Sequence, residues 1–267
     1  MATQTLNTDH LCPVQVMARQ GRLRSPVDAS WCWTSQWPAV AGGHAADEAA
    51  PPPLLYADGR VTIRYAPFDW VNPEARVTLV GITPGPTQMA CALAEAARAW
   101  QEGLPAEAAL RHAKFTASFS GSVMRRNLVQ MLDDIELAAA LGIDSCASLF
   151  AEHAQWLHPT STVLYPVFTR GDEPYRGSSP RISDHPVLHE LATAVLAADL
   201  ELAGRSIVIP LGRAAGEAVT ALVRRGQVEA RRVLPCLPHP SGANGHRPRQ
   251  FAAIRDELRA RVRRWAG

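Results

Sequence analysis

Short apolar segments that alternate with stretches of helical periodicity constrain the fold of this chain most. Val77–Val80 and Ile207–Ile209 are continuous apolar runs of strand length, which is typical of strands buried on both faces of a sheet. Helical spacing follows in other segments, for example at Leu128, Met131, Leu132 and Ile135. Strands that alternate with helices predict a parallel sheet covered on both sides. We therefore expect an α/β fold of three layers, α/β/α, around a central, mainly parallel four-stranded sheet.

Further elements follow from local signals. Asp58-Gly59 lies between two β-rich runs, which predicts a hairpin over Leu54–Tyr65. The remaining expected elements are a helix from Thr87 to Trp100 with Thr87 as N-cap, a helix that starts after Ser122, a strand over Thr162–Phe168 interrupted by Pro166, a helix through Leu188, Leu191 and Val195, a helix through Ala215, Val219 and Leu222, a last strand over Arg232–Leu237, and a final helix through Phe251, Ile254, Leu258 and Val262.

Residues 1–53 differ from the rest of the chain. They contain three tryptophans and end in three consecutive prolines, Pro51–Pro53, which exclude both helix and strand. We expect an N-terminal arm and linker over residues 1–53, followed by one domain over residues 54–267. The tryptophans either anchor the arm to the domain or form a surface that stacks on bases. They are Trp31, Trp33 and Trp37.

Composition excludes several classes of protein. The formal net charge of +2 is too small to predict nucleic-acid binding by itself. Lys114 is the sole lysine, so arginine supplies the other basic residues, and arginine suits phosphate recognition. The cysteine count is odd, at 5, without C-x-x-C spacing, which argues against a disulfide framework or a zinc site. With no membrane-length apolar run and no signal-peptide pattern, we expect a monomer in the bacterial cytosol, without membrane partner, metal or cofactor.

Two loops stand directly after expected strands. The first is Gly81-Ile82-Thr83-Pro84-Gly85, and the second begins His239-Pro240-Ser241-Gly242. Ligands of parallel sheets bind beyond the carboxyl ends of the strands, so we expect both loops to share one crevice. Prolines fix the backbone around His239, whose neutral imidazole can donate a hydrogen bond to an oxygen that gains negative charge. Each loop taken alone is more often structural.

Together, the two loops resemble motifs A and B of the uracil-DNA glycosylase superfamily. The resemblance includes two intervening segments and runs from about Val77 to Arg247. Phe119-Ser120-Gly121-Ser122 is similar to the phenylalanine-containing segment that follows motif A, and Ile209–Ala215 is similar to the strand and Leu-Gly step before motif B. The resemblance implies a uracil-DNA glycosylase-like fold, and an enzyme that flips a damaged base out of DNA and hydrolyses its N-glycosidic bond.

The resemblance also implies roles for individual residues. His239 would face a carbonyl oxygen of the leaving base, and Phe119 would stack on the flipped base. Ser241 would bind a phosphate, and Ala243–Arg247 would enter the minor groove. Gly81, Ile82, Pro84 and Gly85 would contact the base; Gly242, Asn244, His246, Arg247 and Arg125 would contact DNA.

Three departures distinguish this chain from its relatives. Thr83 stands where several branches have Asp, Asn or Glu to position the attacking water, and a hydroxyl is a poor base. Gln88 is a second candidate for holding this water. Thr162–Val167, taken as the middle strand, contains no Asn to read the base edge, which favours a broader range of deaminated bases. The iron–sulfur cysteines of the thermostable branch are absent, so we expect no cluster.

Three functions remain open from the sequence. The first is a monofunctional DNA glycosylase that acts on DNA containing uracil or other damaged bases, leaves an abasic site and releases free uracil. The second is a module that binds damaged DNA with little or no turnover, which Thr83 and the missing Asn favour. The third is an N-glycoside hydrolase that acts on free nucleosides.

Overall fold

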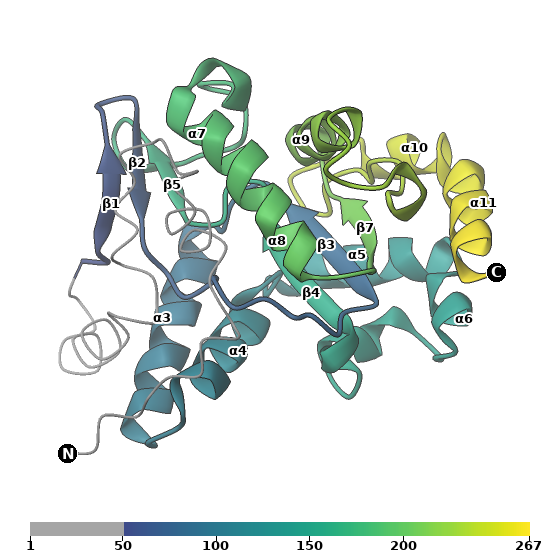
Figure 1. Ribbon diagram of the computed structural model, residues 1–267, viewed down its shortest axis with the longest axis horizontal. Coiled ribbons are helices and arrows are strands. Elements are labelled where there is room, and N and C mark those ends of the chain that lie inside the picture. The colour runs from purple at the N-terminus through teal and green to yellow at the C-terminus, as the bar shows by residue number, and fades with distance from the viewer. Residues whose placement is uncertain (1–50) are drawn as a thin grey trace.

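The computed structural model describes residues 51–267, which form two β-sheets with helices packed around them (Figure 1). The predictions for Trp31, Trp33 and Trp37 lie outside the described residues. One sheet is parallel, with strand order β4-β3-β7, and the other is antiparallel, with order β1-β2-β5-β6. The strands are β1 Leu54–Ala57, β2 Val61–Arg64, β3 Val77–Gly81, β4 Leu157–Ser161, β5 Val167–Thr169, β6 Glu173–Pro174 and β7 Ile207–Pro210. 

Helices occupy most of the remaining described chain. The longer ones are α3 Pro86–Gln101, α4 Ala106–Ala117, α5 Ser122–Asp134, α9 Arg213–Arg224 and α11 Arg255–Ala266. The shorter α-helices are α6 Leu137–Leu141, α7 Pro186–Glu190, α8 Leu196–Leu202 and α10 Arg247–Ala252. A π-helical segment, η5 Leu191–Val195, joins α7 to α8, and 3-10 turns are η2 Cys146–Phe150, η3 Ala154–Trp156, η4 Ile182–Asp184 and η6 Ala230–Arg232.

The prediction of a three-layer α/β/α arrangement is confirmed. Val77 and Leu79 of β3 pack with buried residues of α5, α6 and α11, whereas Val80 and Val208 pack with buried residues of α8 and α9. Alternate residues of a strand point to opposite faces of a sheet, so these two sets belong to its two sides. In Figure 1 the antiparallel sheet lies at one end of the molecule and α11 at the other.

The prediction of a fourth strand in the parallel sheet is wrong. The segment after η6 meets the sheet only through isolated parallel bridges, Val208 with Val233 and Leu211 with Leu237. Pro235 lies between these bridges, and their register differs by one residue, so the pairing is not a continuous ladder. The parallel sheet therefore has three strands, and the segment 233–237 lies along its edge without forming a full strand.

The predicted position of the strand in the middle stretch of the chain is also wrong. In this stretch the strand that pairs with β3 is β4, and it ends at Ser161, one residue before the strand expected over Thr162–Phe168 begins. β4 contains Pro159, which hides its strand character in the sequence, but β4 is an edge strand, where proline is tolerated. Beyond Pro166 the chain forms β5 in the other sheet.

The antiparallel sheet begins with the predicted hairpin, which is confirmed. β1 and β2 pair antiparallel around Asp58, whose carboxylate accepts the backbone N–H groups of Arg60 and Val61. One face of this sheet shares a buried cluster with α3, α4 and α7. Helix α4 was not predicted from the sequence.

Helix ends differ from expectation in two places. The N-cap of α3 is Gly85, not Thr87, because Pro86 starts the helix and the side chain of Gln88 accepts a hydrogen bond from the Gly85 N–H. The expected final helix is divided into α10 and α11, with Ile254 as the N-cap of α11. 

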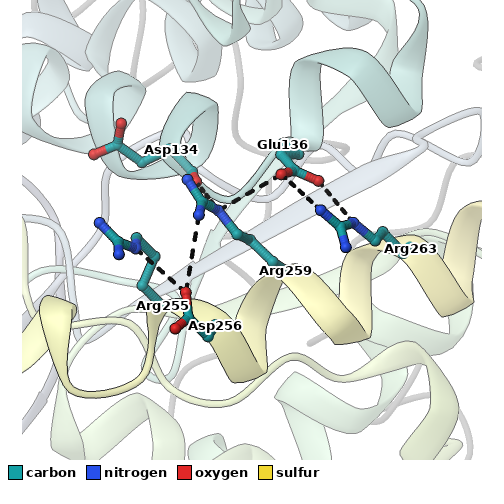
Figure 2. A network of polar contacts seen from close by, with 6 residues as sticks. All are labelled: Asp134, Glu136, Arg255, Asp256, Arg259 and Arg263. Carbon is teal, nitrogen blue, oxygen red and sulfur yellow. Dashed lines mark hydrogen bonds and ion pairs between the residues drawn. The ribbon is translucent and has the colours of Figure 1, made fainter.

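Arginines of the C-terminal helix form a polar network with the end of α5 and the start of α6 (Figure 2). Arg263 donates two hydrogen bonds to Glu136, and Arg259 donates to the carbonyl oxygen of Asp134. Arg255 and Arg259 also pair with Asp256, a residue of α11. Three arginines of this helix therefore serve contacts within the protein, although they are partly exposed.

Within residues 51–267, no helix is both long and apolar enough to cross a membrane.

Candidate functional site

A cleft of about 540 Å³ opens beyond the carboxyl ends of β3 and β4. Gly81 and Ser161 are the last residues of these strands and form the last pair of their register. Three segments distant in sequence meet there: the loop 81–85, the end of α4 with Phe119, and the loop that contains His239. The cleft is lined by Phe68, Gly81, Ile82, Thr83, Pro84, Gly85, Gln88, Lys114, Ser118, Phe119, Met124, Pro159, Thr160, Ser161, Leu164, Pro174, Tyr175, Arg176, His239, Ser241 and Ala243.

Backbone hydrogen bonds fix the first loop against the segment that follows β4. The carbonyl oxygen of Gly81 accepts the N–H and the hydroxyl of Thr162, at 2.8 and 2.9 Å. The carbonyl oxygen of Ile82 accepts the N–H of Val163 at 2.9 Å. The loop is therefore held rigid where it borders the cleft, as a preorganised binding surface requires.

Thr83 contributes a hydroxyl whose proton is already engaged. Its Oγ1 donates to the carbonyl oxygen of Tyr165 at 2.7 Å. The lone pairs of this oxygen remain able to accept a hydrogen bond from a water. The geometry thus allows Thr83 to orient a water but not to remove a proton from it.

Gln88 is divided between a structural contact and the cleft. Its Oε1 accepts the N–H of Gly85 at 2.9 Å, which caps α3. Its side chain also lines the cleft, where its amide NH₂ group remains a donor. A role for Gln88 in holding the attacking water stays a prediction.

Phe119 adopts an unusual backbone conformation at the cleft. Its φ is +53°, a left-handed value that is uncommon for a residue other than glycine. Its ring is buried, and the ring carbon Cε1 lies 3.6 Å from the position that a Cβ on Gly81 would occupy. Ser161 Oγ lies 3.5 Å from the same position. An aromatic face and a hydroxyl therefore border the same part of the cleft.

His239 is held by contacts on both sides of its ring. The backbone N–H of Ser241 donates to Nδ1 at 3.3 Å, so the neutral imidazole carries its proton on Nε2. A Cβ added to Gly212 would lie 3.3 Å from Cδ2 of the ring. Burial lowers the pKa of His239, because desolvation disfavours the charged form. The site thus presents a neutral imidazole with Nε2–H as its free donor.

The second loop is anchored to α5 and to its own backbone. Asn127 donates to the carbonyl oxygen of Pro240 at 2.9 Å, and Asn244 donates to that of His239 at 3.2 Å. Gly242 packs against Val123, which lies 3.1 Å from the position that a Cβ on Gly242 would occupy. Ser241 lines the cleft, and its Oγ accepts the N–H of Ala243.

The residues expected to contact DNA occupy different environments. Gly242 and His246 are exposed, whereas Asn244 and Arg247 are partly buried, and Arg247 donates to the carbonyl oxygen of Ser241 at 3.4 Å. Arg125 points inward, since it donates to the carbonyl oxygen of Ser118 at 3.1 Å and stacks on the ring of Phe150. Burial lowers the pKa of Arg125. Its contacts are those of a structural residue.

The sequence did not predict every cleft residue, and four of those it missed have polar or charged side chains of interest: Lys114, Ser161, Tyr175 and Arg176. Lys114 is fully buried, and its Nζ donates to the carbonyl oxygen of Trp70 at 2.5 Å. Its status as the sole lysine was the only signal for it. Ser161 was missed because the middle strand was assigned to later residues. Tyr175 and Arg176 follow a strand of two residues, β6, which has no recognisable pattern.

The side chains that line the described cleft include positive charges but no negative ones. Lys114 and Arg176 are cationic, and none of the residues that line the cleft in the described chain is a carboxylate. In residues 51–267 no cluster of His, Cys, Asp and Glu side chains could hold a metal ion. The described cleft therefore offers donors and a neutral imidazole for an electron-rich ligand.

Comparison with known proteins gives two matches. The family model of the uracil DNA glycosylase superfamily matches residues 68–259. The chain is also 38% identical over 214 residues to a protein of Bacillus subtilis (strain 168) named "Uncharacterized protein YoxB". That similarity covers 79% of this chain and 83% of the relative. The region matched by the family model contains every described residue that lines the cleft.

Proposed function

This chain belongs to the uracil DNA glycosylase superfamily, and we propose that it is a DNA glycosylase that excises uracil and other deaminated bases. The reaction hydrolyses the N-glycosidic bond, releases the free base and leaves an abasic site. The observation that carries the proposal is the presence of the Nε2–H of His239 and the ring of Phe119 in one cleft at the ends of β3 and β4.

The first step is capture of the base outside the DNA stack. A flipped base loses its stacking partners, which costs a few kcal/mol and least for a mispaired base. Phe119 offers an aromatic face in exchange, and its left-handed backbone holds the ring at the cleft. Backbone strain of this kind persists where a functional site requires it.

Cleavage of the bond moves negative charge onto the leaving base. The neutral His239 donates a hydrogen bond from Nε2 to a carbonyl oxygen of this base. A fixed donor in a site without water stabilises such charge by about 3 kcal/mol. The electron pair of the glycosidic bond leaves with the base, and positive charge develops on the sugar.

Water then attacks the sugar carbon that has lost the base, and the proton that this water gives up goes to the departing base anion, which leaves as the neutral free base. Because no carboxylate of the described chain lines the cleft, stabilisation of the leaving group supplies most of the rate. Thr83 accepts a hydrogen bond from this water through the lone pairs of Oγ1. The proton of Oγ1 remains on the hydroxyl and is donated in a hydrogen bond to the carbonyl oxygen of Tyr165.

The range of bases follows from Ser161. This hydroxyl stands beside Phe119 at the end of β4, where it can meet the edge of a stacked base. A hydroxyl donates or accepts, whereas an amide presents a fixed donor and a fixed acceptor. Ser161 therefore admits bases with different edge patterns, and we expect uracil, hypoxanthine and xanthine to be released.

The proposal is tested by an assay of base release. The full chain is incubated with single- and double-stranded oligonucleotides that contain uracil, hypoxanthine, xanthine or a mismatched thymine, and abasic sites are cleaved with alkali. We expect cleavage at uracil and at least one further deaminated base. The absence of cleavage on every substrate would refute glycosylase activity.

The lack of a carboxylate in the described cleft favours a second candidate, a module that binds damaged DNA without turnover. It predicts a stable complex with uracil-containing DNA and no released base in the same experiment. Release of free base at more than one equivalent per protein would exclude it.

Thr83 provides a test of the proposed water site. Replacement of Thr83 by valine preserves the shape of the side chain but removes the hydroxyl that orients the water. Because a poorly positioned reactant reacts more slowly, we expect kcat to fall by about tenfold to a hundredfold, with KM unchanged. Thr83→Ser is the matched control, because serine keeps the hydroxyl, and it should retain most of the activity. Equal kcat values for the wild type and the valine variant would exclude this role.

A further inference from the structure

Arg176 lines the cleft and comes from a different part of the fold than the His239 loop. It lies two residues after β6 of the antiparallel sheet, whereas Ser241 belongs to the loop that packs on α5. Both residues line the same cleft. A ligand in the cleft can therefore meet both Arg176 and Ser241.

The backbone on both sides of Arg176 is held in place. Tyr175 is buried, its N–H donates to the carbonyl oxygen of Val167 at 3.0 Å, and its hydroxyl donates to that of Pro180 at 2.6 Å. Gly177 has a φ of +84°, and a Cβ added there would lie 2.9 Å from Cβ of Ala214 and 3.1 Å from Cγ2 of Ile82. Gly177 thus lets the chain pack directly on the first loop, which places Arg176 at the cleft.

The charge of Arg176 has no partner within the described chain. Its side chain is exposed, and it forms no ion pair with any residue of 51–267. The other cation of the cleft, Lys114, is fully buried and bonded to Trp70. With no carboxylate among the described lining residues, Arg176 is the accessible charge of the cleft wall and fits an anionic ligand.

We propose that Arg176 binds a backbone phosphate of the DNA strand that carries the flipped nucleotide. This inference rests on the proposed function. When a base occupies the cleft, the phosphates that flank its sugar remain at the cleft mouth, because the backbone continues outside the protein. A guanidinium binds two phosphate oxygens at once. Arg176 would then hold the strand from one side while the Ser241 loop contacts it from the other.

The test measures DNA affinity as a function of salt, which needs no turnover. Fluorescence anisotropy is recorded with labelled uracil-containing oligonucleotides, single- and double-stranded, over a series of salt concentrations. Loss of one phosphate contact should make the plot of log affinity against log salt shallower by about 0.9 for duplex and about 0.7 for single strands. We expect this change for Arg176→Ala, with affinity about tenfold weaker at the lowest salt.

Two variants control the experiment. Arg176→Lys keeps the positive charge and should retain the salt slope with a smaller loss of affinity. Arg225→Ala removes an exposed arginine at the far end of α9, roughly 18 Å along the helix from Gly212, and should leave the slope unchanged.

The outcomes separate this inference from the proposed function. An unchanged slope for Arg176→Ala overturns the phosphate contact, even if the wild type releases bases. A change in base preference with an unchanged salt slope would show that Arg176 contacts the base, and it would also overturn the proposed phosphate contact. A shallower slope supports the inference, even if the wild type releases no base.

Discussion

Replacement of His239 by alanine should reduce kcat for uracil release by about a hundredfold to a thousandfold, the cost of losing one fixed donor to developing charge. KM should change little, because the hydrogen bond strengthens only as charge develops on the base. Single-turnover base release with excess enzyme measures this effect directly. His239→Gln retains an N–H donor and should recover part of the rate.

The pH dependence identifies the form of His239 that acts. Burial lowers the pKa of His239 below its ordinary value of 6.5, so the neutral imidazole predominates at neutral pH and above. Because the neutral imidazole is the donor, the rate should be highest at and above neutral pH and should fall on acidification with a midpoint below pH 6.5. A rate that rises as the pH falls through 6.5 would instead assign catalysis to the cation.

The control for His239 is an exposed histidine elsewhere in the chain. His112 lies on α4 and does not line the cleft, so His112→Ala should have wild-type kcat. Equal rates for His239→Ala and the wild type would remove His239 from the mechanism.

Replacement of Gly212 by alanine should reduce kcat by about tenfold or more although it leaves His239 in the chain. The new Cβ would lie 3.2 and 3.3 Å from Cβ and Cδ2 of His239, so the imidazole must move. Small displacements of a catalytic group have large effects on rate. Gly212 has φ +86° and ψ 159°, a region that is essentially restricted to glycine, so a loss of stability of about 1–3 kcal/mol is also expected.

A variant of a second glycine, at the other end of α9, distinguishes an effect on activity from an effect on stability. Gly226 has φ +71°, and a Cβ there would meet no atom within 4 Å. Gly226→Ala should therefore lower stability, measured by thermal unfolding, but should not change kcat well below Tm. If both variants keep full activity, contact between Gly212 and the imidazole does not position His239.

Much of the fold was predictable because its signals are local. The apolar runs of β3 and β7, the Asp58-Gly59 turn and the periodicity of α5 each depend on residues within a few positions of one another. The three-layer arrangement follows from their alternation and is confirmed. The family that the two loops suggested is likewise confirmed by the match of the family model over residues 68–259.

The two wrong strand predictions have a common physical cause. Pro159 and Pro235 both disrupt strand patterns locally, and both lie in segments at an edge of the parallel sheet, where proline is tolerated. β4 pairs with β3 in a continuous ladder through Pro159, whereas the segment that contains Pro235 forms only two bridges, whose register differs by one residue. Which segment forms a full strand depends on its pairing with a distant neighbour and is not encoded within the segment.

The sequence by itself determined the α/β layers and the presence of His239, Phe119 and the Gly81–Gly85 loop in one cleft. Only the tertiary structure decided which charges reach this cleft, because it turned Arg125 toward Phe150, buried Lys114 and left Arg176 exposed at the wall. It also placed the proton of His239 on Nε2 and directed the hydroxyl of Thr83 to the carbonyl oxygen of Tyr165. Backbone pattern is encoded by neighbouring residues, whereas the environment of a side chain depends on partners far away in the sequence, such as the 82 positions between Thr83 and Tyr165 and the 113 between Asn127 and Pro240.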